Sequence, residues 1–193
     1  DAEVFTFTIA DGEAGKSSAS LLKVWDWLGA AGFTRSDLIV GIGGGATTDF
    51  AGFAAATWLR GMDWIAIPTT VAGAVDAAVG GKTAINSDYG KNLIGSFHSP
   101  IKVAIDLDWL KTLTDRDFAA GLAEVVKCGF IADGVILDLM RGKTTAEIRG
   151  EQSLVKELVE RAIKVKADAV SQDFKESFAR EALNYGHTLG HAV

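Results

Sequence analysis

The chain has 193 residues, of which 48% are hydrophobic and 23% are charged, and its formal net charge is −6 at pH 7. This composition is typical of a globular protein and excludes intrinsic disorder, and about 150 residues per domain gives roughly 1.3 domains. The negative charge argues against a broad basic surface for nucleic acid, but a few lysines could still line a pocket for a small anion. The single cysteine and the lack of a long apolar run favour a cytoplasmic protein without a membrane span.

The first 114 residues are expected to alternate strands with helices. The predicted strands are Val4–Ile9, Leu38–Ile42, Trp64–Ile67 and a short one over Val103–Asp106, and the predicted helices are Ser18–Ala31 and Thr47–Arg60. The second strand is continuously apolar, as a buried strand of a parallel sheet should be. This order favours right-handed βαβ units, so we predict an α/β fold with a parallel sheet.

Residues 115–193 are expected to be helical. Thr114 can cap a helix over Asp115–Ile131, and two more helices are predicted over Glu151–Ser171 and Ala182–Val193. The segment before them, Val79–Asn92, is rich in glycine and is expected to be irregular. We therefore predict two domains, an α/β domain over residues 1–114 and a helical domain over residues 115–193.

Three consecutive glycines separate the Leu38–Ile42 strand from the next predicted helix. Gly41–Ala46 fits the pattern G-x-G-x-x-A, in which backbone N–H groups and a helix N-terminus bind a pyrophosphate. The full dinucleotide fingerprint needs an acid at the end of the next strand, whereas Asp63 precedes that strand. We favour nucleotide binding over the alternative that the glycines serve only tight packing.

Other polar residues stand where a ligand could bind. Thr69 and Thr70 follow a strand end, so they could reach a nucleotide or cap the next helix. Lys82 and Lys91 lie in a stretch with few charges, either as anion ligands or as ordinary exposed lysines. The segment Asp11–Lys16 is by itself more typical of a solvated turn.

Two predicted helices carry residues suited to a metal and an anion. Glu124 and Lys127 share a helix face, either as an ordinary ion pair or as a metal carboxylate beside a substrate anchor. A second stripe has metal-ligand spacing between its histidines and is formed by Arg180, Asn184, His187 and His191. We expect His98 to be structural and Cys128 to be a buried apolar residue.

Taken in order, these motifs resemble the 3-dehydroquinate synthase family. The resemblance runs through the blocks Asp11–Lys16, Gly43–Asp49, Pro68–Thr70, Val75–Asn86, Gly90–His98, Gly121–Lys127 and Leu183–Ala192. Each motif alone is weak, but their order along nearly the whole chain is specific.

The resemblance implies an α/β domain that binds NAD, followed by the start of a helical domain that binds a divalent metal, usually Zn²⁺, with Co²⁺ as an alternative. The residues that would contact NAD are Asp11, Gly12, Glu13, Lys16, Gly43, Gly44, Gly45, Asp49, Thr69, Thr70, Lys82, Lys91 and Thr112. The metal ligands would be Glu124 and His187.

The implied substrate is a sugar-acid phosphate, 3-deoxy-D-arabino-heptulosonate 7-phosphate. Its phosphate would be held by Lys82, Asn92 and Lys127, and its carboxylate by Lys166, Arg180 and Asn184. Asp76 would meet a ring hydroxyl, and His191 would serve near the phosphate and the proton transfers. Arg60 matches an arginine that family members lend across a homodimer interface.

The implied reaction yields 3-dehydroquinate and phosphate. It combines a transient oxidation by NAD, phosphate elimination, re-reduction and an intramolecular aldol closure, so NAD is not consumed. The resemblance also implies further family segments before Asp1 and a third metal ligand, a histidine, beyond Val193. We therefore expect the 193 residues to be a piece of a longer enzyme, with weak or no turnover by themselves.

Three alternatives remain open. The chain could belong to a related sugar-phosphate cyclase or to a metal-dependent polyol dehydrogenase, which share the two-domain plan. It could be a catalytically incompetent NAD-binding piece. It could also be a generic α/β domain whose glycines serve packing alone.

Overall fold

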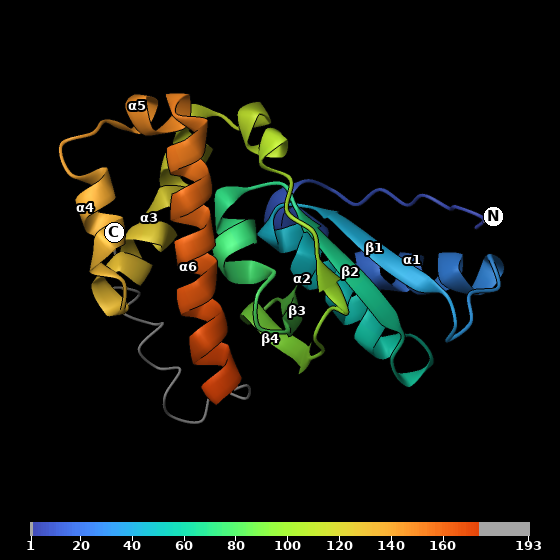
Figure 1. The fold of residues 1–193 in the computed structure, drawn as a ribbon. Helices are drawn as coiled ribbons and strands as arrows, with labels where there is room; N and C mark the ends of the chain where they lie inside the picture. The colour runs from blue at the N-terminus through green and yellow to red at the C-terminus, as the bar shows by residue number, and fades with distance from the viewer. Residues whose placement is uncertain (1, 174–193) are drawn as a thin grey trace.

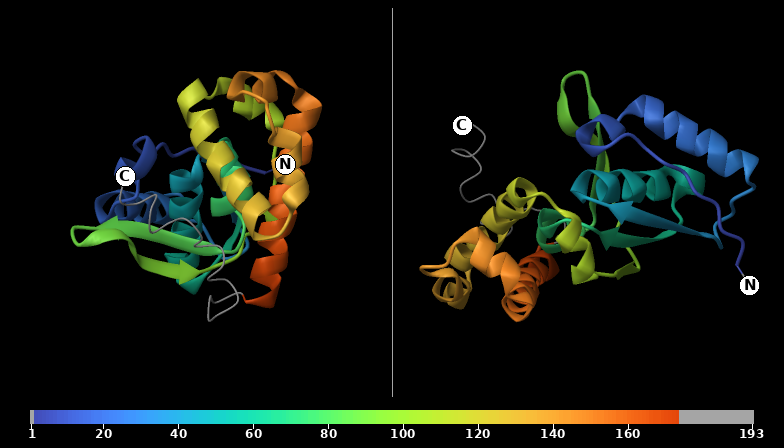
Figure 2. Two further views of the ribbon diagram at one scale, coloured as in Figure 1. Left: turned by 90° about the vertical axis from the view of Figure 1, so that its left-hand side faces the viewer. Right: turned by 90° about the horizontal axis from the view of Figure 1, so that it is seen from above.

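The computed structural model describes residues 2–173 of the chain. An α/β part contains a three-stranded sheet and two helices, and a helical part packs beside it (Figures 1 and 2). The elements of the α/β part are η1 (Gly12–Gly15), α1 (Ser18–Ala30), β1 (Leu38–Gly43), α2 (Gly45–Thr57), η2 (Trp58–Arg60), β2 (Asp63–Pro68), η3 (Gly73–Ala77), β3 (Lys82–Ser87), β4 (Gly90–Phe97) and β5 (Lys102–Val103). The helical part comprises η4 (Leu107–Thr112), α3 (Asp115–Ile131), α4 (Gly134–Met140), α5 (Thr145–Gly150) and α6 (Gln152–Gln172).

The main sheet is parallel, as predicted, with the strand order β1-β2-β5. Helix α2 packs closely on it, because a Cβ added at Gly41 of β1 would lie 2.6 Å from the Ala51 Cβ of α2. Gly52 approaches Trp64 of β2 in the same way, with 2.6 Å between an added Cβ and the ring. Glycine at these two contacts therefore allows α2 to lie close to the sheet.

Three predicted elements of the α/β part were wrong or too long. Val4–Ile9 forms no strand; it is an extended segment whose Phe7 ring packs 5.3 Å from the Trp27 ring, so aromatic contacts replace strand pairing. The segment Val79–Asn92 is not irregular, because most of it belongs to the antiparallel hairpin β3–β4, with a bulge between Ile85 and Ser87. The strand predicted over Val103–Asp106 is only Lys102–Val103.

Helix α3 begins and ends where the sequence predicts. Thr114 caps α3, and its side chain accepts a hydrogen bond from Asp117 N. The long helix predicted over Glu151–Ser171 is α6, whereas α4 and α5 were not predicted. The predicted helix Ala182–Val193 lies outside the described residues.

The π-helix η3 lies between the sheet part and the helices, and it contacts α2, α3 and α6 (Figure 1). Val71 lies just before η3 and Val75 lies within it, and both are 1% exposed. They share a core with residues of α3 and α6 such as Val125 and Leu158. The division into domains at residue 114 stays a prediction. Among the described residues, no helix is both long and apolar enough to cross a membrane.

Candidate nucleotide and metal site

The glycine turn lies at the carboxyl end of β1 and begins α2. Gly44 is the N-cap of α2, so the N–H groups that begin this helix lie at the glycine turn. Thr69 N donates to Gly43 O at 2.8 Å, which joins the turn to the end of β2. A Cβ added at Gly44 would lie 3.2 Å from Thr70 Cγ2. Thr69 and Thr70 therefore border the glycine turn.

The segment Asp11–Lys16 is folded against α2. Asp11 caps η1 by accepting from Gly12 N, and Lys16 Nζ lies 2.8 Å from Asp49 Oδ2. Burial raises the pKa of Asp49, while the hydrogen bond and charge of Lys16 oppose that shift. The structure thus brings Asp11, Glu13, Lys16 and Asp49 together beside the glycine turn, although Lys16 is 1% exposed.

The β3–β4 hairpin brings a third segment to the same place. Asn92 Oδ1 accepts from Lys16 Nζ at 2.5 Å, and the Asn86 side chain donates to Glu13 Oε2 at 2.7 Å. Lys82 and Lys91 lie on this hairpin with exposed side chains. Asn86 was not among the predicted site residues; the Gly-Gly-Lys-Thr-Ala-Ile-Asn block that contains it was the available signal.

A cluster of two carboxylates and two lysines lies where η3, α3 and α6 meet. Asp76 of η3 contacts Lys166 Nζ of α6 through Oδ1, and the same oxygen lies 4.0 Å from Lys127 Nζ of α3. Lys127 Nζ also contacts Glu124 Oε2. Both lysines are nearly buried, at 9% and 10% side-chain exposure, so their charges require these carboxylates.

Glu124 is suited to bind a metal ion. Its Oε2 is buried and accepts no hydrogen bond, although Lys127 lies close enough for an ion contact. A buried carboxylate oxygen with spare acceptor capacity is an appropriate ligand for a divalent cation. Residues 2–173 contain no group of three or more potential metal ligands, and the second predicted ligand, His187, lies outside them.

Two predicted residues lie on other elements, and three more lie outside the described residues. Arg60 precedes β2, whereas Thr69 follows it, so the two are separated by the strand's length of roughly 16 Å. Thr112 ends η4, where its exposed hydroxyl donates to Trp109 O at 2.7 Å. The remaining three, Arg180, Asn184 and His191, lie outside the described residues.

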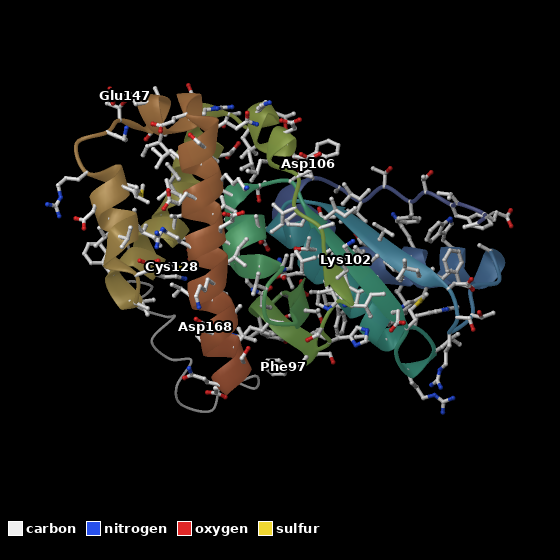
Figure 3. All side chains as sticks on the ribbon, viewed as in Figure 1. Phe97, Lys102, Asp106, Cys128, Glu147 and Asp168 are labelled. Carbon is white, nitrogen blue, oxygen red and sulfur yellow. The ribbon has the colours of Figure 1, made fainter. Side chains whose placement is uncertain are left out.

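The expected structural roles of His98 and Cys128 are confirmed. His98 Nε2 lies 2.8 Å from Met62 O, and its carbonyl accepts from the Trp64 indole at 3.1 Å. Cys128 is 2% exposed and lies between α3 and α6 (Figure 3), where burial raises the pKa of its thiol.

Comparison with known proteins agrees with the motif order. The family model described as 3-dehydroquinate synthase N-terminal matches residues 6–120, and the one described as 3-dehydroquinate synthase C-terminal matches residues 121–193. A 3-dehydroquinate synthase of Thermobifida fusca is 58% identical over 191 residues, which cover 99% of this chain and 52% of that protein. The chain thus spans about half the length of the curated relatives it matches.

Solved structures of two other synthases have the same fold. The 2-epi-5-epi-valiolone synthase of Streptomyces hygroscopicus, with NAD⁺ and Zn²⁺ bound, is 30% identical, with a TM-score of 0.86 over 93% of this chain and 51% of that one. A 2-deoxy-scyllo-inosose synthase, complexed with carbaglucose-6-phosphate, NAD⁺ and Co²⁺, is 30% identical, with a TM-score of 0.82 over 94% of this chain and 50% of that one. The predicted fold class is therefore confirmed, and the chain belongs to the 3-dehydroquinate synthase family.

Proposed function

We propose that the chain carries the NAD site and part of the metal and substrate site of a 3-dehydroquinate synthase, a carbon–oxygen lyase of the cytoplasm. The observation that carries this proposal is the position of η3. One end of η3 touches the glycine turn, because a Cβ added at Gly73 would lie 3.3 Å from Gly45 N. Asp76, on the same short helix, belongs to the cluster with Lys127 and Lys166. A nucleotide on the turn would therefore lie next to a charged substrate site.

The nucleotide part of the site follows from the glycine turn. Glycines at 43–45 allow a pyrophosphate to approach the backbone at the start of α2, and Glu13 and Asp49 offer acceptors for ribose hydroxyls. NAD supplies hydride acceptance and return when it is bound there. Thr69, Thr70, Lys82, Lys91 and Thr112 stay proposed contacts.

The substrate part follows from the charged cluster. Lys127 and Lys166 present ammonium groups that can bind the phosphate and the carboxylate of a sugar-acid phosphate. Asp76 can accept a hydrogen bond from a ring hydroxyl, and Glu124 would hold a divalent metal together with His187. The metal supplies a Lewis acid that lowers the pKa of the substrate hydroxyls.

The position of Arg60 fits a homodimer. Because Arg60 lies at the far end of β2, it is remote from the glycine turn of its own chain. We propose that it serves the site of a second subunit, and that the enzyme is a homodimer.

A related sugar-phosphate cyclase is the second candidate function. The likeness to the valiolone and inosose synthases favours it, since both share the fold at 30% identity. The two candidates differ in the substrate carboxylate, which Lys166 would bind in a 3-dehydroquinate synthase. A sugar phosphate without a carboxylate would not need that contact.

Turnover by the polypeptide that extends this chain to the relatives' full length tests the proposal. With 3-deoxy-D-arabino-heptulosonate 7-phosphate, NAD⁺ and Zn²⁺, we expect phosphate release without net NADH, whereas the 193 residues alone should show weak or no turnover. Accumulation of one NADH per substrate would instead identify a dehydrogenase. Turnover of a sugar phosphate without a carboxylate, but not of the sugar-acid phosphate, would identify the second candidate.

A further inference from the structure

Lys16 is fully buried although it carries a charge. At 1% exposure it is among the largest fully buried side chains of residues 2–173. The ammonium group donates to Asp49 Oδ2 at 2.8 Å and to Asn92 Oδ1 at 2.5 Å. A buried ammonium is stable only when it is paired and hydrogen-bonded, so these contacts constrain where both partners lie.

Through these contacts Lys16 joins three segments that are distant in sequence. Asp49 belongs to α2, near the glycine turn, and Asn92 belongs to β4. The Lys16 carbonyl accepts from Asn86 N at 2.7 Å, and Asn86 in turn donates to Glu13 Oε2 at 2.7 Å. Both strands of the β3–β4 hairpin are therefore attached to the segment Asp11–Lys16.

The conformation of Asn92 agrees with this attachment. Its φ of +58° is in the left-handed region, which asparagine tolerates better than most residues. Asn92 N donates to Asn86 Oδ1 at 3.0 Å, so both its backbone and its side chain are held. This geometry directs the side-chain carbonyl of Asn92 to the buried ammonium.

We propose that Lys16 is a positioning residue that fastens the β3–β4 hairpin to the nucleotide turn. The assignment of Asn92 and Lys82 to substrate phosphate rests on the proposed function, but the fastening itself does not. The proposal differs from a direct contact between Lys16 and NAD, because the Lys16 side chain is enclosed by protein and already has two partners. It predicts that loss of the ammonium loosens a hairpin that Lys16 does not belong to.

Amide hydrogen exchange of residues 82–97 tests the proposal in the ligand-free chain. In Lys16→Met we expect exchange in the hairpin to be faster by on the order of tenfold, about 1.4 kcal/mol. Exchange in α6, which Lys16 does not contact, should stay within about twofold of the wild type. A purely structural role would accelerate both regions, because the whole fold would be less stable.

Two substitutions at Asn92 keep the test valid if Lys16→Met fails to fold. Asn92→Gly retains the left-handed backbone but removes the acceptor, so it should also loosen the hairpin. Asn92→Asp retains an acceptor and should stay close to the wild type. If both ends act through one contact, Lys16→Met combined with Asn92→Gly should loosen the hairpin no more than either change alone.

The control is Lys23→Met, which removes an exposed lysine of α1 and should not alter the hairpin. Unchanged hairpin exchange in both Lys16→Met and Asn92→Gly would overturn the proposal, as would strictly additive effects in the double variant. NAD titration of the same proteins separates the two claims. Failure of the wild type to bind NAD would count against the proposed function, while the ligand-free exchange data would still decide the role of Lys16.

Discussion

The contact of Glu124 with Lys127 could be predicted from their spacing in the sequence, whereas other contacts of the charged cluster could not. The spacing of Glu124 from Lys127 predicted a shared helix face, and the structure confirms their contact. The contact of Lys166 with Asp76 spans 90 residues, and no local pattern predicts such a pair. Only the family resemblance placed these residues in one site, because long-range side-chain geometry depends on packing that local periodicity does not encode.

At this scale we predict that Glu124→Gln weakens metal binding. The amide is isosteric but lacks the negative charge, so Zn²⁺ affinity of the full-length polypeptide should fall by on the order of 100-fold. Competition with a chromophoric chelator measures this directly. Glu160→Gln, an exposed change on α6, is the matched control and should leave the affinity unchanged. Equal Zn²⁺ affinity in Glu124→Gln and the wild type would remove Glu124 from the metal site.

At the scale of elements, prediction succeeded where a helix or strand was long and regularly patterned. Thr114 and the run that follows it gave the start and end of α3. Strand β4 gave no such signal, because nearly all of its residues are exposed and no alternation of apolar and polar residues results. Helices α4 and α5 have 7 and 6 residues, too few for a helical period to stand out.

Packing between elements yields a second prediction, for Gly121 of α3. A Cβ at this position would lie 2.5 Å from Val71 Cβ and 3.0 Å from Ala72 N, and backbone cannot easily move aside. Gly121→Ala should therefore lower the free energy of unfolding by about 1–3 kcal/mol. Gly150→Ala is the control, since nothing lies within 4 Å of its added Cβ, and it should be neutral or slightly stabilising. Similar denaturant midpoints for the two variants would contradict the close contact of α3 with residues 71–72.

The capping box of α5 yields a prediction about pH. The Glu147 carboxylate, at the outer edge of the helical part in Figure 3, accepts from Thr144 N and Oγ1. These hydrogen bonds lower its pKa below the ordinary value of 4.5. A pKa that is lower in the folded state means that this stabilisation is present above the unfolded pKa and is lost as pH falls through the folded one.

Glu147→Gln removes that titration while keeping a side-chain acceptor. The wild type should therefore be the more stable protein at pH 7, and its advantage should disappear as pH falls below about 4.5. Urea unfolding of both proteins between pH 7 and pH 3 measures the difference. A difference that stays constant over this range would show that the ionised carboxylate does not stabilise α5.

At the scale of the whole molecule, the path of the chain brings the glycine turn and the charged cluster together. The order of motifs predicted the family and the parallel sheet, but it did not predict that η3 would link the turn to the cluster. That link depends on close contacts such as Gly73 with Gly45 and on the core shared by Val71 and Val75 with α3 and α6. These contacts depend on the packing of elements far apart in sequence, so they become visible only in the folded chain.

Titration of NAD⁺ into the 193-residue chain tests the central claim most directly. We predict saturable binding of one NAD⁺ per chain, because this chain carries the glycine turn together with the nearby acceptors Glu13 and Asp49. Gly44→Ala adds a Cβ that would lie 3.2 Å from Thr70 Cγ2, so it should displace the turn that would bind the pyrophosphate and lower the affinity by at least on the order of tenfold. A folded wild-type chain that gives no saturable signal, or a variant that binds NAD⁺ as tightly as the wild type, would contradict a nucleotide site at this turn.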